Sequence, residues 1–128
     1  MSLTMNQCGV IDNHHQRVDL YKRVITVCSG ACLRSPTAAV VLSQDPFNFN
    51  TRAVGLTDEY AIVKLDDGLH MWADEFVVME PWMKDALLVR YSETDRPIYV
   101  LNIPDHFQYR DPELMQMIKD KYLEVTSE

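Results

Sequence analysis

The fold is decided by one stretch of sequence, Val24-Ile25-Thr26-Val27-Cys28-Ser29-Gly30-Ala31-Cys32-Leu33-Arg34-Ser35-Pro36-Thr37-Ala38. Its first four residues form a short run of β-branched side chains, which is typical of a strand buried on both faces. Residues 35–43 have a proline in the first turn and an apolar face, which predicts a helix. A strand, a loop with a glycine and a helix in direct succession predict the first unit of an α/β fold, with a ligand site at the loop.

The same alternation continues along the rest of the chain. Further strands are expected at 52–54, 76–79 and 98–101, and further helices at 66–74, at 81–91 and from 111 onward. The last helix begins with Asp111-Pro112-Glu113, which combines a capping side chain, a first-turn proline and an acid near the positive helix end. We interpret Trp72 and Trp82 as core residues. Such alternation calls for a parallel sheet covered by helices on both faces.

Length and composition limit the function classes. The 128 residues fit one domain, expected at 21–128, while residues 1–20 are interpreted as an N-terminal extension or mobile loop. The net charge is −7, from 12 basic and 19 acidic residues, which argues against binding to nucleic acid or an anionic membrane. No run of about 20 apolar residues and no secretory signal is expected. Three cysteines favour a reducing, cytoplasmic compartment.

The loop between the first strand and its helix carries the chemistry. Cys28 and Arg34 are separated by five residues, a spacing that can curl into a cradle of inward-facing backbone N–H groups. A phosphate fits this cradle, and Arg34 can grip two of its oxygens. The same positive field favours the thiolate form of Cys28, which is then placed for in-line attack, and Ser35 can hydrogen-bond the sulfur. The expected phosphate-binding residues are Ser29, Gly30, Ala31, Cys32, Leu33, Arg34 and Ser35.

This run resembles the signature of the low-molecular-weight protein tyrosine phosphatases. Two further segments agree: residues 72–80 resemble the third-strand segment of that family, and Ile103-Pro104-Asp105-His106-Phe107 resembles its general-acid loop. The likeness covers about residues 22–123. It implies a three-layer, flavodoxin-like α/β sandwich whose four-stranded parallel sheet has the order 2-1-3-4.

The resemblance also implies an activity and three catalytic roles. Cys28 would be the nucleophile that forms a phosphocysteine, Arg34 would bind the phosphoryl oxygens, and Asp105 would act as general acid and then general base. Asp111 is the rival for the acid, but its position is explained by a helix cap. The implied substrate is a phosphotyrosine-containing protein or a small aryl phosphate, hydrolysed without a metal or another cofactor.

Several other residues have open interpretations. Phe107, Tyr109 and Tyr60 are candidates for an apolar wall against a substrate ring, or for ordinary packing. Cys32 could form a reversible disulfide with Cys28 or serve as a small buried apolar residue. Cys8 is expected to be inert.

Three alternative functions use the same loop. A phosphate- or phosphopeptide-binding module with weak catalysis stays open, because Ala31 and His106 depart from the usual pattern of the phosphatases. Arsenate reduction coupled to thioredoxin is disfavoured, since no cysteine follows Cys32. A phosphocarrier of sugar transport is disfavoured as well, because such carriers do not need the arginine and serine at positions 34 and 35.

Overall fold

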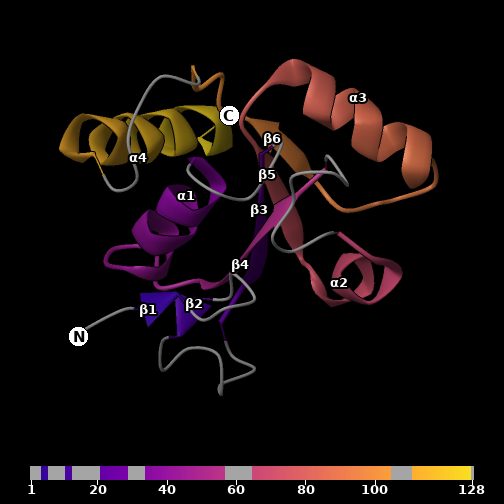
Figure 1. Ribbon diagram of the computed structural model, residues 1–128, viewed down its shortest axis with the longest axis horizontal. Coiled ribbons are helices and arrows are strands. Elements are labelled where there is room, and N and C mark those ends of the chain that lie inside the picture. Colours follow the sequence, from indigo (N-terminus) through magenta and orange to yellow (C-terminus); the bar gives the residue numbers. More distant parts are fainter. Residues whose placement is uncertain are drawn as a thin grey trace.

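The computed structural model describes residues 21–28, 34–56, 65–104 and 111–127, and the backbone of residues 4–5 and 11–12. Four strands in these ranges form one sheet (Figure 1): β3 (Arg23–Cys28), β4 (Asn50–Gly55), β5 (Glu75–Val78) and β6 (Ile98–Val100). Every neighbouring pair is parallel, and the strands lie in the order β4-β3-β5-β6. Counted along the chain, this sheet has the order 2-1-3-4, which confirms the expected fold.

The two inner strands are buried along almost their whole length. In β3, Val24, Ile25 and Val27 are fully buried, and in β5 the same is true of Val77 and Val78. Inner strands of a parallel sheet are covered by helices on both faces. A strand in which apolar and polar residues alternate would therefore place polar side chains in the core, and these two strands lack that alternation. The edge strand β6 is only half-buried along its length.

Four helices cover the sheet (Figure 1). Helices α1 (Arg34–Ser43) and α4 (Pro112–Thr126) lie on one face, and α2 (Asp67–Trp72) and α3 (Pro81–Arg90) lie on the other. Every residue of α1 is buried, because α1 packs against β3, β4 and α4. Within the described ranges, no helix has the length and apolar character needed to cross a membrane.

The predicted start of the last helix is confirmed. The Asp111 carboxylate accepts a hydrogen bond from the backbone N–H of Glu113 at 2.9 Å, and Pro112 is the first helical residue. The cap explains Asp111 without any catalytic role. Helix α4 then buries Leu114, Ile118 and Tyr122, which lie four residues apart on one face.

One observation adds to the sequence interpretation and a second contradicts it. A two-stranded antiparallel pair, β1 (Thr4–Met5) with β2 (Ile11–Asp12), lies within the segment that was interpreted as an extension or loop. The prediction that Trp82 is a core residue is wrong, because this side chain is 45% exposed. Helix α3 buries only Met83 and Leu87, and Trp82 lies about 100° around the helix from Met83.

A buried polar network fastens α4 to the amino-terminal end of the sheet. Glu75, the first residue of β5, is 2% exposed, and its carboxylate binds the Lys22 ammonium at 2.7 Å and the Tyr122 hydroxyl at 2.8 Å. The rings of Phe47 and Phe49 meet the Tyr122 ring edge-on. A buried carboxylate is tolerated when cations and donors satisfy its oxygens, as they do here.

Candidate active site

The carboxyl ends of β3 and β5 meet the amino ends of α1 and α3 at one edge of the sheet. Cys28 is the last residue of β3, and Arg34 is the first residue of α1. The backbone N–H of Leu56, which follows β4, donates to the Cys28 carbonyl oxygen at 3.1 Å. Ligands of open α/β sheets bind at this edge, so the position of the described residues agrees with the expected ligand site.

Cys28 and Ser35 contact each other directly. The distance between Cys28 Sγ and Ser35 Oγ is 3.0 Å, and both residues are buried. Ser35 Oγ also lies 3.4 Å from the carbonyl oxygen of Val54. Either atom of the Cys28–Ser35 pair can be the donor, and the Val54 carbonyl oxygen is a second acceptor within reach of the Ser35 hydroxyl. The contact expected from the sequence is therefore present.

The Arg34 guanidinium is held by two described partners. Its Nη1 donates to Glu80 Oε2 at 2.7 Å and to the carbonyl oxygen of Ile103 at 2.9 Å. The Arg34 side chain is 3% exposed, whereas that of Glu80 is 37% exposed. The carboxylate thus faces solvent on one side and neutralises a buried cation on the other, which reduces the cost of burying the charge.

Sequence reasoning did not assign a role to Glu80. The residue belongs to the 72–80 segment, which was recognised only for its strand. In the structure Glu80 is two residues beyond the end of β5 and is the N-cap residue of α3, which places it beside Arg34. Its position in the sequence could have identified it as a site residue, because it is an acidic residue just after a buried strand. In a parallel sheet, that end of a strand lies at the edge where ligands bind.

The chain beyond β6 delivers Ile103 to this site. The Leu101 N–H donates to the Val78 carbonyl at 2.9 Å, and the Ile103 N–H donates to the Met79 carbonyl at 2.8 Å. Between them, Asn102 has a φ of 57°, in the left-handed region that asparagine tolerates better than most residues. These bonds fix the Ile103 carbonyl, which accepts from Arg34, one residue before Pro104.

The remaining predicted site residues lie outside the described residues. These are Ser29, Gly30, Ala31, Cys32, Leu33, Tyr60, Asp105, Phe107 and Tyr109, and Cys8, expected to be inert, lies outside them as well. Among the residues that are described, no group of three or more His, Cys, Asp or Glu side chains is placed to hold a metal ion.

Comparison with solved structures defines the class of fold. The chain matches low-molecular-weight phosphatases over most of its length, and its strand order and flanking helices are those of the low-molecular-weight protein tyrosine phosphatase fold. No protein-family model matches the chain, and no curated protein matches it in sequence.

Three solved structures illustrate the similarity. The YwlE arginine phosphatase from Geobacillus stearothermophilus is 22% identical over 80% of this chain and 91% of that chain, with a TM-score of 0.60. The low-molecular-weight protein tyrosine phosphatase from Streptococcus pyogenes is 18% identical over 80% and 91% of the two chains, with a TM-score of 0.64. Vibrio vulnificus Wzb, solved with benzylphosphonate, is 18% identical over 79% and 94%, with a TM-score of 0.63.

Proposed function

We propose that this protein is a cysteine-dependent phosphomonoester hydrolase of the protein tyrosine phosphatase type, acting through a phosphocysteine. The observation that carries the proposal is the 3.0 Å contact between Cys28 Sγ and Ser35 Oγ at the carboxyl end of the central strand. The buried guanidinium of Arg34 belongs to the residue directly before Ser35. The fold shared with solved phosphatases supports the same conclusion.

In the first proposed step, the Cys28 sulfur attacks the phosphorus of the substrate. The S–P bond forms as the ester P–O bond breaks, and the carboxyl group of Asp105 gives its proton to the departing oxygen. Ile103, whose carbonyl accepts from Arg34, precedes Asp105 by two residues in the sequence. The anchored backbone therefore supports Asp105 as the acid of this step.

In the second step, water attacks the phosphorus of the phosphocysteine. Asp105 takes a proton from the water, the new P–O bond forms, and the S–P bond breaks to release inorganic phosphate and the Cys28 thiolate. A hydrogen bond from Ser35 Oγ stabilises the sulfur as its negative charge returns. Because this charge is smallest in the intermediate, the bond favours the departure of the sulfur.

Arg34 is proposed to bind the phosphoryl oxygens in both steps. Charge spreads over the equatorial oxygens of a transferring phosphoryl group, and a fixed guanidinium stabilises it without reorganising during the reaction. The bonds to Glu80 and Ile103 hold the guanidinium in place before the substrate arrives. Glu80 is accordingly a positioning residue.

The preferred substrate class is an aryl phosphate, either phosphotyrosine in a protein or a small aryl ester. Phosphoarginine is a second candidate, because an arginine phosphatase is among the solved structures that this chain matches. The two classes differ in the leaving atom, which is a phenolic oxygen in one and a guanidino nitrogen in the other. Peptides that carry each phosphorylated residue distinguish them by the phosphate released.

The direct test uses purified protein with para-nitrophenyl phosphate, with and without EDTA, beside the Cys28→Ser variant. We expect release of nitrophenolate that EDTA does not change and that the variant lacks. Turnover that survives in Cys28→Ser would contradict the proposal. Phosphate binding without turnover in the wild-type protein would support the phosphate-binding module instead.

A further inference from the structure

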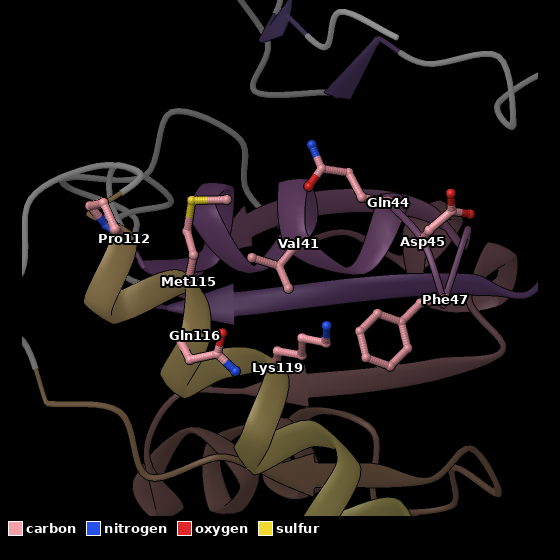
Figure 2. A pocket seen from close by; sticks show the side chains of 8 residues that line it. All are labelled: Val41, Gln44, Asp45, Phe47, Pro112, Met115, Gln116 and Lys119. Atoms are coloured by element: carbon pink, nitrogen blue, oxygen red, sulfur yellow. The ribbon is translucent and has the colours of Figure 1, made fainter.

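A groove of about 310 Å³ lies between the carboxyl end of α1 and the first half of α4 (Figure 2). It is lined by Val41, Gln44, Asp45, Phe47, Pro112, Met115, Gln116 and Lys119. Val41 follows Arg34 by seven residues, about 10 Å along the axis of α1 at 1.5 Å per residue. The groove is therefore separate from the candidate active site.

One part of the groove is apolar. Val41 on α1, Met115 on α4 and the Phe47 ring in the turn after α1 all line it. Figure 2 shows the Phe47 ring and the Lys119 side chain approaching the space below Val41 from two different elements. An apolar lining with a few polar groups is the usual composition of a small-molecule site, and the volume is at the lower end of the range for such sites.

The charged group of interest is the Lys119 ammonium. In the described part of the chain, Lys119 makes no hydrogen bond and no ion pair, although it is partly buried. Lys22 offers a contrast, since its ammonium lies 2.7 Å from the Glu75 carboxylate. A cation beside apolar surface attracts an anion that also has an apolar body.

Some of the other polar side chains that line the groove already make hydrogen bonds within the protein, and one does not. Asp45 Oδ1 accepts from Asn48 Nδ2 at 2.6 Å, and Gln116 Nε2 donates to Asp120 Oδ1 at 2.8 Å. Gln44 has no side-chain hydrogen bond among the described residues, so its amide is a second donor available to a ligand.

We propose that this groove binds a small amphipathic carboxylate. The aromatic or branched apolar body would pack on Phe47 and Met115, and the carboxylate would bind the Lys119 ammonium. At about 30 Å³ per water in the liquid, the groove has the volume of about ten waters, which suits a ligand the size of phenylacetate.

The test is a titration of the protein with phenylacetate, followed by amide NMR shifts, in saturating inorganic phosphate to occupy any phosphate site. We expect saturable shifts confined to residues 41–47 and 112–119. Neutral 2-phenylacetamide and the Lys119→Gln variant should each weaken binding about tenfold or more, the usual contribution of a charge-assisted hydrogen bond. Lys84→Gln, which makes the same charge change on exposed α3, should leave the affinity unchanged.

A second variant covers the case in which Lys119→Gln fails to fold. Asp45→Asn retains an oxygen acceptor for Asn48 and removes the negative charge at the groove, so it should tighten binding of the carboxylate. Two results would overturn the proposal: no saturable shifts in the groove while phosphate is present, or equal affinity for the acid and the amide.

Discussion

The Arg34 guanidinium donates to the carbonyl oxygen of Ile103 at 2.9 Å, and 69 positions of sequence separate the two residues. This bond joins the start of α1 to the segment that follows β6. The same Nη1 also binds Glu80, so three parts of the chain meet at one nitrogen. The geometry implies that the position of the cation depends on residues far from the Cys28 loop in sequence.

Removing the charge of Glu80 should weaken the site. In Glu80→Gln, the buried Arg34 loses its carboxylate but retains a neutral acceptor, so the guanidinium is held less firmly. Hydrogen bonds to charged groups contribute about 1.5–3 kcal/mol. Because Glu80 is 37% exposed, we expect its substitution to remove about 1–2 kcal/mol of transition-state stabilisation. The predicted result is a roughly 5- to 30-fold lower kcat/KM for para-nitrophenyl phosphate and weaker inhibition by phosphate.

The matched control is Glu113→Gln, which removes the same charge from the exposed first turn of α4. It should leave kcat/KM unchanged. An equal loss of activity in both variants would mean that overall charge, and not the position of Arg34, determines the rate.

Truncation of Ser35 should slow breakdown of the intermediate. Ser35→Ala removes the hydroxyl 3.0 Å from Cys28 Sγ, and a bond of this kind is worth about 1.5–3 kcal/mol, or about 10- to 150-fold in rate. Stopped-flow measurement should show a retained burst of nitrophenolate with a reduced steady-state rate. Ser43→Ala, at the other end of α1, should behave as wild type. If Ser35→Ala alone lost the burst, Ser35 would instead act in the first step, the formation of the phosphocysteine.

Stability at high pH should depend on Tyr122. Burial, and then the neighbouring Glu75 carboxylate, raise the pKa of the Tyr122 hydroxyl far above its usual value of 10.0. Above pH 10 the unfolded chain releases this proton and the folded chain keeps it, so the free energy of unfolding falls by about 1.4 kcal/mol per pH unit from this group. Below pH 10 this contribution is constant.

The Tyr122→Phe variant separates this effect from other titrations. At pH 8 it should be less stable than wild type by about 1–3 kcal/mol, because the buried Glu75 carboxylate loses a donor. From pH 10 to 12 the difference should shrink, since only the wild type loses the Tyr122 contribution. Urea unfolding at several pH values measures the free energy of unfolding of the two proteins. A constant difference between them from pH 10 to 12 would show that Tyr122 ionises equally in the folded and unfolded states.

Mild acid should destabilise the contact between α2 and the segment after α3. The His70 ring stacks on Tyr91 with centroids 4.0 Å apart, and its Nε2 lies 2.9 Å from Thr94 Oγ1. Burial, and then Arg96, lower the pKa of His70 below its usual 6.5. As the pH falls through this range, the unfolded chain binds the proton more readily, so the free energy of unfolding decreases.

His70→Phe retains an aromatic ring and removes the titration. Its melting temperature should therefore fall less between pH 7 and pH 5 than that of the wild type. Parallel pH profiles for the two proteins would contradict a coupling between His70 protonation and folding.

Local sequence patterns were sufficient to predict the four strands of the central sheet and their parallel arrangement, whereas the strand order came from the family resemblance. The buried runs at β3 and β5, the prolines at the starts of α3 and α4, and the Asp111 cap all lie within a few residues of the features they determine. The helix expected at 66–74 ends earlier, at Trp72, because the Asp74 carboxylate accepts from the Arg23 N–H at the start of β3. That partner is 51 positions away and leaves no local signal.

The same reasoning explains what was missed at the site. The Cys28, Arg34 and Ser35 spacing is local and could be recognised, whereas the pairing of Arg34 with Glu80 depends on which strands are neighbours. Trp82 was assigned to the core wrongly, because the sequence of a short helix does not show whether an aromatic side chain faces the core or the solvent. Helix α3 buries a single narrow stripe, and Trp82 lies outside it.

The most direct test of the proposed chemistry is to trap the covalent intermediate. Ser35→Ala, in which breakdown should be slow, is mixed with para-nitrophenyl phosphate, quenched in acid within the burst and digested for mass spectrometry. The account predicts a single phosphoryl group on the sulfur of Cys28, absent when Cys28→Ser is added to the same protein. A phosphoryl group on another residue, or turnover with no labelled Cys28, would contradict it.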